Sequence, residues 1–378
     1  MKRLGLIVNP IAGIGGRVGL KGSDGLNVQQ RARALGAKPQ AQERTAAALE
    51  TLQPLIEDIE LLTPPDKMGE TVAHRCGFAL RVIPTPGLSA ETRTSTTPGD
   101  TRHAAQAMRD AGVDLILFAG GDGTARDMYE AIGNDFPVLG IPAGVKIHSA
   151  VYGITPHSAG ELAVEFLRGG RVRLREAEVL DLDEASYREG RIITSLYGYL
   201  KIPYRREHVQ NQKVPTPASE SVQAQAIAAE VIERMAPGMA YLLGPGTTTR
   251  AVAERLGLPK TLVGVDIITY DEMLAADVGE QQILEILEQR PLGLIVTPTG
   301  GQGFLLGRGN QQISPEVIRR AGRENIMIVC LASKIAALQG RPLLVDTGDL
   351  EVDHLLAGYV EVVTGYHEKI IYRVMGGG

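Results

Sequence analysis

The chain has 378 residues, of which 44% are hydrophobic, so it can build sizeable cores and is expected to fold into two domains. Its formal charge is -5, from 39 basic and 44 acidic residues, with no Trp and five Phe. This composition argues against nucleic acid or a membrane surface as the main partner, because such sites favour basic stripes and aromatic clusters. The two cysteines, Cys76 and Cys330, form no CxxC pair, and no run approaches the ~20 apolar residues of a membrane span. We therefore expect a cytoplasmic protein.

Short apolar runs alternate with amphipathic segments along most of the chain. Nearly continuous apolar strands are typical of parallel sheets covered on both faces, so this alternation predicts an α/β fold with right-handed crossovers. The expected strands are 4–10, 113–121, 136–144, 239–246, 292–301 and 325–333. The expected helices are 101–112, 157–170, 222–235, 247–258, 279–290 and 314–322.

One region departs from this rhythm. Residues 175–207 alternate in two-residue steps around Glu189 and Gly190, which predicts an antiparallel hairpin. We take the change of sheet type as the domain boundary. The prediction is a nucleotide-binding domain over residues 1–150 with a doubly wound parallel sheet, and a β-rich α/β substrate-binding domain over residues 151–378. The C-terminal tail is a candidate for returning to the first domain.

Four glycine-rich loops follow predicted strands directly. Glycine accepts a positive φ and lets a ligand approach the backbone, and the N–H groups at the following helix start favour an anion. A tight turn explains any one of these loops, but four together favour a phosphorylated ligand. No GxxxxGK[ST] pattern is present, so this is not a standard P-loop. The loops are 9–16, 120–124, 244–249 and 297–303, and the residues expected to contact ligand include Gly13, Gly246, Thr247, Gly300 and Gly301.

The second loop, GGDGT, places the carboxylate of Asp122 beside the expected phosphates. A phosphate repels a carboxylate unless Mg²⁺ lies between them or a hydroxyl donates a hydrogen bond to the carboxylate and awaits deprotonation. Both arrangements indicate phosphoryl transfer. The alternative is that Asp122 caps the following helix or belongs to an Asp-Gly turn. A carboxylate occupied by main-chain amides and facing away from any cavity would contradict the catalytic interpretation.

Two further pairs of polar residues are candidates for binding anions. Lys146 and His148 follow the third predicted strand and could neutralise negative charge, although a solvated lysine and a histidine bonded to a carbonyl fit equally well. Arg308 and Asn310 lie in GRGN, where flanking glycines would expose a guanidinium and an amide to a second anion.

GGDGT together with NPIAG resembles the superfamily of NAD kinases, diacylglycerol kinases and sphingosine kinases. TPTGGQGF, from Thr297 to Phe304, is similar to the TPTGSTAY segment of NAD kinases. The longer segments GGDGTARD, IPAGVKIHSAVYGITP and GPGTTTRAV look like the ATP-NAD kinase-like branch named for the acetoin-catabolism X protein. The resemblance extends from Asn9 to about Ala332.

This resemblance implies specific roles for matching residues. Asp122 would contact the ribose 2'-hydroxyl of the acceptor, and Thr297 and Thr299 would line a dinucleotide pocket. The residues implied in binding ATP and its phosphates are Asn9, Gly120, Gly121, Gly123 and Thr124.

The chain also departs from the family pattern. Gly301 and Gln302 replace the Ser and Thr of TPTGSTAY, and the Asn-Glu pair that holds the nicotinamide ribose has no clear counterpart, with 277–280 the nearest candidate. The resemblance implies a Mg²⁺-dependent kinase that transfers the γ-phosphoryl group of ATP, or of polyphosphate, to NAD, and that forms a homo-oligomer. The alternatives are a kinase of another small polyol or of a lipid-like acceptor, and a nucleotide-binding regulatory protein without turnover.

Overall fold

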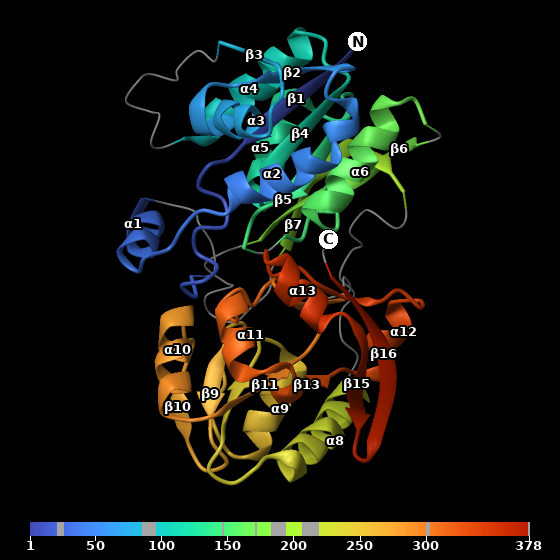
Figure 1. The fold of residues 1–378 in the computed structure, drawn as a ribbon. Helices are drawn as coiled ribbons and strands as arrows, with labels where there is room; N and C mark the ends of the chain where they lie inside the picture. Colours follow the sequence, from blue (N-terminus) through green and yellow to red (C-terminus); the bar gives the residue numbers. More distant parts are fainter. Residues whose placement is uncertain are drawn as a thin grey trace. The chain divides into compact units, whose positions relative to one another are not determined.

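The computed structural model describes residues 1–20, 26–84, 96–145, 147–170, 172–182, 194–205, 219–299 and 303–376 (Figure 1). The chain divides into two compact units, and each is described by itself. The first unit comprises Met1–Gly15, Gly22–Ser186 and Ile192–Gln212, and the second comprises Gly16–Lys21, Tyr187–Arg191 and Lys213–Gly378.

The first unit is built on a five-stranded parallel sheet in the order β3-β2-β1-β4-β5. The strand order reverses between β1 and β4, so the loops that follow these two strands meet at the position where open α/β sheets bind ligands. This confirms the expected doubly wound parallel sheet. The strands are β1 (Lys2–Val8), β2 (Ile59–Thr63), β3 (Leu80–Val82), β4 (Leu115–Gly120) and β5 (Val138–Pro142).

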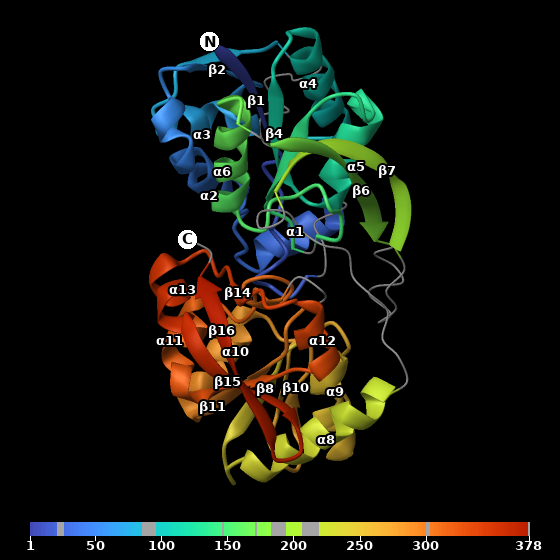
Figure 2. The ribbon, with the colours of Figure 1, turned by 90° about the vertical axis from the view of Figure 1, so that its right-hand side faces the viewer.

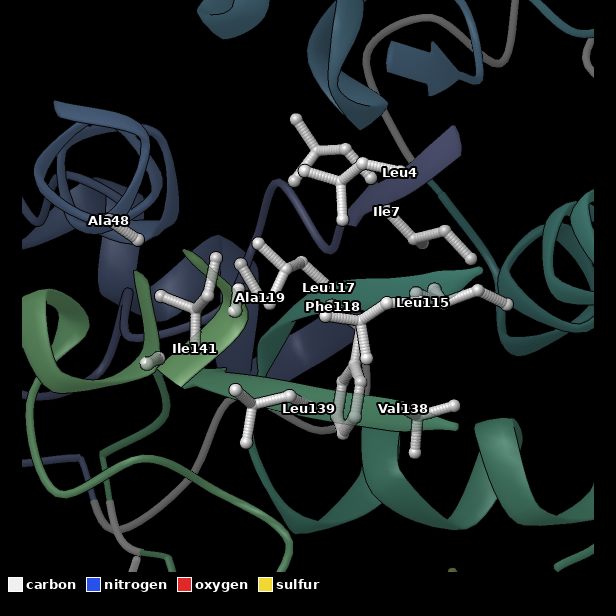
Figure 3. Close-up of a cluster of buried hydrophobic side chains, with 14 of the residues drawn as sticks. Leu4, Ile7, Ala48, Leu115, Leu117, Phe118, Ala119, Val138, Leu139 and Ile141 are labelled. Atoms are coloured by element: carbon white, nitrogen blue, oxygen red, sulfur yellow. The ribbon is translucent and has the colours of Figure 1, made fainter. Parts of the chain in front are cut away.

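Helices cover both faces of this sheet. In Figure 2, α2, α3 and α6 lie on one side of strands β1 and β4, and α4 and α5 lie on the other. Figure 3 shows the core between these layers, where side chains from β1, β4 and β5 gather, among them the fully buried Leu4, Phe118 and Leu139. The helices are α1 (Leu26–Ala34), α2 (Ala41–Thr51), α3 (Glu70–Arg75), α4 (Pro98–Asp110), α5 (Asp122–Ile132) and α6 (Pro156–Leu167), with short 3₁₀ turns at Gln53–Leu55 and Asp66–Met68.

The predicted hairpin belongs to the first unit. Strands β6 (Arg173–Leu182) and β7 (Thr194–Tyr204) pair antiparallel as a separate two-stranded sheet. The first unit therefore extends to residue 212, whereas the sequence analysis placed the boundary at 150. The physical reason is that a two-stranded sheet cannot bury its apolar face alone. The hairpin buries that face in the core of the first unit through Ala177, Val179, Leu200 and Ile202.

The second unit contains a mixed nine-stranded sheet in the order β10-β9-β8-β11-β13-β15-β16-β14-β12. Its centre is parallel, and β9, β10 and the β15–β16 hairpin supply the antiparallel pairs. This confirms a second, β-rich α/β domain. The strands are β8 (Ala240–Leu243), β9 (Asp266–Ile268), β10 (Met273–Ala275), β11 (Leu292–Val296), β12 (Phe304–Leu306), β13 (Ile326–Val329), β14 (Leu343–Val345), β15 (Gly358–Gly365) and β16 (Glu368–Gly376).

Alternate residues of the central strands face two separate cores. Leu242 and Val296 pack with α10, α11 and α13, whereas Leu243 and Ile295 pack with α8 and α9. The C-terminal hairpin is part of this sheet, so the tail lies in the second unit and not in the first. The helices are α8 (Ser219–Arg234), α9 (Thr247–Arg255), α10 (Glu280–Gln289), α11 (Pro315–Ala321), α12 (Ala332–Ala337) and α13 (Leu350–Leu356), with a 3₁₀ turn at Arg323–Asn325.

Among the described residues, none of the helices combines the length and hydrophobicity that a membrane crossing requires.

Candidate active site

In the first unit, the loops after β1 and β4 are joined by hydrogen bonds. The backbone N–H of Asn9 donates to the carbonyl oxygen of Ala119 at 2.9 Å, and Asn9 Nδ2 donates to Thr124 Oγ1 at 3.1 Å. Asn9 and Thr124 were both expected beside the ATP phosphates. The structure brings them together at the carboxyl end of the sheet.

The glycines of these loops allow very close packing of the chain on itself. Gly13 has φ +78, and a Cβ there would lie 2.5 Å from the carbonyl oxygen of Ala143. A Cβ on Gly144 would lie 2.7 Å from Gly121 Cα, and the N–H groups of Ala143 and Gly144 both donate to the Gly120 carbonyl oxygen at 3.0 and 2.9 Å. The loops after β1, β4 and β5 can therefore meet only because these positions lack side chains. Gly123 lies in the first turn of α5.

Asp122 is the first residue of α5 and is buried. Its Oδ1 accepts from the backbone N–H groups of His148 and Ser149 at 3.1 and 2.9 Å. Its Oδ2 accepts from the His148 N–H at 2.8 Å and lies 3.1 Å from His148 Nδ1. It is not the helix cap, because Gly121 holds that position. Asp122 thus joins the segment after β5 to the start of α5.

These contacts define what the carboxylate is able to bind. A carboxylate only accepts hydrogen bonds, so the ring contact is a hydrogen bond in the tautomer of His148 that carries the proton on Nδ1. Two oxygens offer about four acceptor positions, and three N–H groups already approach Asp122. The sequence analysis expected an acid waiting for a ligand hydroxyl. In the structure, N–H groups of the same chain take most of the acceptor positions of the Asp122 carboxylate.

The sequence analysis missed two residues that complete this arrangement. Ser149 exchanges hydrogen bonds with β6, since its Oγ donates to the Leu180 carbonyl oxygen and accepts from the Leu180 N–H, both at 3.0 Å. The hydroxyl of Tyr152 donates to the Gly121 carbonyl oxygen at 2.5 Å. No motif signals these roles, because the partners are backbone groups. Lys146, which the sequence analysis singled out, lies outside the described residues.

In the second unit, Gly246 and Thr297 lie together. Gly246 is the N-cap of α9 with φ +131, and Thr247 is the first helical residue. Thr297 follows β11, which is the strand next to β8, and a Cβ on Gly246 would be 3.0 Å from Thr297 Cγ2. Gly300 and Gly301 lie outside the described residues.

The remaining predicted residues of this unit contact their own chain. Thr299 Oγ1 donates to the Phe304 carbonyl oxygen at 3.0 Å. Asn310 Nδ2 donates to the Leu305 carbonyl oxygen at 2.8 Å, and Asn310 Oδ1 accepts from the Gly307 N–H at 3.1 Å. These side chains hold the turns around β12.

Arg308 is buried, and its guanidinium lies 4.6 Å from the centre of the Phe304 ring. Its Nε donates to Asp346 Oδ2 at 3.4 Å. The sequence analysis expected a ligand anion beside Arg308. In the structure, the carboxylate of Asp346 in the same chain bonds to this guanidinium.

Within the described ranges, the one close group of three acidic or metal-ligating residues is Glu230, Glu233 and His367, in the second unit. Glu230 also binds Arg234 at 2.6 Å and accepts from the His367 N–H at 2.8 Å. The three residues therefore belong to an ion-pair network that joins α8 to the C-terminal hairpin.

Two family models match the chain. The ATP-NAD kinase N-terminal domain matches residues 4–172, and the ATP-NAD kinase C-terminal domain matches residues 238–374. Together they cover most of the chain, so it belongs to the ATP-NAD kinase family, whose members are phosphotransferases that use ATP as phosphoryl donor. The acetoin-catabolism X branch stays a prediction. A search of curated proteins found no match.

Proposed function

We propose that this kinase transfers the γ-phosphoryl group of ATP to a hydroxyl of NAD and so produces NADP. The observation that carries the proposal is the match of both ATP-NAD kinase domains to one chain, in their family order. A homo-oligomer in the cytoplasm is part of the same proposal, and it rests on the family resemblance and the composition.

The loops of the first unit suit an ATP phosphate chain. They meet at the switch point of the sheet, where β1 ends beside β4. Asn9, Gly121 and Thr124 lie there at the N-terminus of α5, whose dipole favours negative charge. In phosphoryl transfer the protein mainly positions the reactants and stabilises charge.

Mg²⁺ in this proposal is held mainly by the ATP phosphates. It commonly uses one or two carboxylates and several waters in addition to substrate oxygens. Asp122 is the carboxylate of this loop, and N–H groups take most of its acceptor positions. When bound, Mg²⁺ would neutralise charge that develops on the phosphates.

Asp122 has two tasks in the proposed reaction. It holds the segment of His148 and Ser149, and its remaining acceptor position receives the hydroxyl of NAD. The hydroxyl oxygen bonds to the γ-phosphorus, the bond from that phosphorus to the β,γ-bridging oxygen breaks, and the hydroxyl proton passes to the carboxylate. ADP leaves with the electron pair of the broken bond.

One observation favours a second candidate, a nucleotide-binding regulatory protein without turnover. The three N–H donors on Asp122 account for this residue without any substrate. Another small polyol, a lipid-like acceptor, or polyphosphate as donor would keep the kinase chemistry and change only the reactants.

A panel of acceptors with ATP and Mg²⁺, followed by mass spectrometry, tests the proposal. The wild type is compared with Asp122→Asn and with Asp110→Asn, an exposed control at the end of α4. We expect NADP from the wild type and the control. Asp122→Asn should lose turnover by a factor of about 100 or more, in the range of a lost general base. If Asp122→Asn binds ATP as the wild type does and makes product equally fast, the catalytic task is disproved. If no wild-type acceptor is phosphorylated, the regulatory candidate replaces the kinase.

A further inference from the structure

We infer that His148 is a positioning residue for phosphoryl transfer: its imidazole fills one oxygen of the Asp122 carboxylate and so directs the acceptor hydroxyl to the other oxygen. The inference rests on the proposed function in one respect, that Asp122 receives a hydroxyl. It gives His148 a task other than neutralising phosphate charge, and it gives the two oxygens of Asp122 different tasks. Both residues belong to the first unit.

The two oxygens of Asp122 accept from different donors. Oδ2 accepts from the His148 N–H at 2.8 Å and lies 3.1 Å from His148 Nδ1. Oδ1 accepts from the Ser149 N–H at 2.9 Å, and it shares the His148 N–H at the longer distance of 3.1 Å. Each oxygen of a carboxylate offers about two acceptor positions. Oδ2 is therefore filled, whereas the weaker shared contact leaves Oδ1 able to accept one more hydrogen bond.

The two backbone donors belong to a segment that β6 holds in place. Ser149 Oγ bonds to both backbone groups of Leu180, and the Ala150 N–H donates to a β6 carbonyl oxygen at 2.9 Å. These contacts fix the backbone donors independently of the side chain at position 148. Among the described residues, the His148 ring is the one side chain that donates to Asp122. A substitution at this position therefore removes the ring contact alone.

Burial gives the ring contact its importance. The side chain of Asp122 is 8% exposed and that of His148 is 4% exposed. Charge-assisted hydrogen bonds are strong in such surroundings, and buried acceptors seldom stay unbonded. Without the ring, Oδ2 would offer a second position to a hydroxyl or a water, away from the geometry that transfer requires. Misplacement of a reacting group by about 1 Å can slow a reaction by about 100-fold.

The consequence for the proposed reaction is a fixed path for the proton. The hydroxyl proton passes to Oδ1 of Asp122 while the hydroxyl oxygen bonds to the γ-phosphorus and ADP leaves. The His148 ring takes up no proton in this step, because its Nδ1–H donates to Oδ2 throughout. Loss of the ring contact should therefore lower kcat and leave the affinity for the substrates unchanged.

Two amide variants isolate the ring contact. The side-chain nitrogen of Asn lies near the position of histidine Nδ1, and that of Gln lies near Nε2, so His148→Asn keeps a donor to Asp122 and His148→Gln does not. With ATP, Mg²⁺ and NAD, we expect His148→Gln to lose kcat by about 10- to 100-fold at unchanged KM values. His148→Asn should retain most of the wild-type kcat. His103→Asn, a change at an exposed histidine of α4, is the control.

A merely structural role would give a different result. Both His148 variants would then be less stable, but kcat per folded molecule would equal that of the wild type. This outcome for His148→Gln overturns the inference and leaves the kinase proposal intact. If His148→Gln does not fold, a loss of kcat in His148→Asn as large as about tenfold overturns it instead, because this variant keeps the donor.

Nitrogen-15 NMR of the histidine rings provides a readout without turnover. The inference requires the ring proton of His148 on Nδ1, and the signals that disappear in His148→Asn identify this ring. An unprotonated Nδ1 overturns the inference, whether or not the wild type makes NADP. If the wild type phosphorylates no acceptor, the proposed function fails, and the ring protonation by itself then decides whether His148 fills Oδ2.

Discussion

His148 contacts the carboxylate of Asp122 twice, once with its backbone N–H, at 2.8 Å from Oδ2, and once with ring Nδ1, at 3.1 Å from the same oxygen. The two residues are 26 positions apart in sequence. One residue thus supplies both a main-chain and a side-chain donor to a buried acid. This pair connects the segment after β5 to the start of α5, and it holds the loop of residues 120–124 in the first unit.

A pair of variants separates the ring contact from the backbone contact. His148→Ala removes a donor from a buried carboxylate and should destabilise the protein by about 1–3 kcal/mol. His148→Asn places an amide N–H near the former Nδ1 and should recover part of that loss. Urea unfolding measures the difference. Equal stability of wild type and His148→Ala would show that the ring contact contributes nothing.

The packing around Gly13 can be tested with Gly36 as a control, because the two glycines have nearly the same φ. Their φ values are +78 and +77, but a Cβ on Gly13 would be 2.5 Å from a carbonyl oxygen, while a Cβ on Gly36 would have no atom within 4 Å. Both alanine variants incur left-handed backbone strain of about 1 kcal/mol. Gly13→Ala should lose about 1–3 kcal/mol more, because the loops must separate. Calorimetric unfolding that gives the same loss for both variants would contradict this packing.

The buried pair of Lys260 and Asp266 should be costly to break. Both side chains are fully buried and lie 2.9 Å apart. Lys260→Met leaves an uncompensated buried carboxylate and should destabilise the protein by about 3–5 kcal/mol. Adding Asp266→Asn should restore part of this loss, since the charge is removed and one oxygen still accepts a hydrogen bond, although the Thr261 and Asp277 N–H groups bond to different oxygens of Asp266 and one of them loses its acceptor. Urea unfolding of the single and double variants measures the coupling. Additive losses would show that the charges do not interact.

The ion network of the C-terminal hairpin predicts loss of stability in acid. The His367 N–H and the Arg234 guanidinium hold the pKa of Glu230 below its ordinary value of 4.5, and Lys369 and Arg234 lower the pKa of Glu361 in the same way. The folded state therefore favours the charged carboxylates. This contribution is complete above about pH 4.5 and is lost as the pH falls through the folded-state pKa values.

Urea midpoints between pH 7 and pH 3 measure this effect. Glu230→Gln should lower the midpoint at pH 7 and flatten its decline in acid. Glu254→Gln, which removes an exposed pair with Arg250, should change neither appreciably. A Glu230→Gln profile parallel to the wild type would exclude Glu230 as a source of acid sensitivity.

The long periodic elements follow directly from the sequence. The apolar runs at 113–121 and 292–301 became β4 and β11, and the amphipathic segment 247–258 became α9. Strands of three residues, such as β9 and β12, are too short to show a periodic pattern in the sequence. They form because neighbouring strands of the sheet pair with them.

What the sequence determined by itself is the local chemistry: the strand-loop-helix units, the glycines at their ends and the family to which these motifs belong. These features depend on residues close in the chain. Tertiary structure decided the partners of the polar side chains, since Asp122 meets His148 and Arg308 meets Asp346 only after strands far apart in sequence have packed. It also assigned the β6–β7 hairpin to the first unit, because burial of Val179 and Leu200 depends on the surface available to them and not on their spacing.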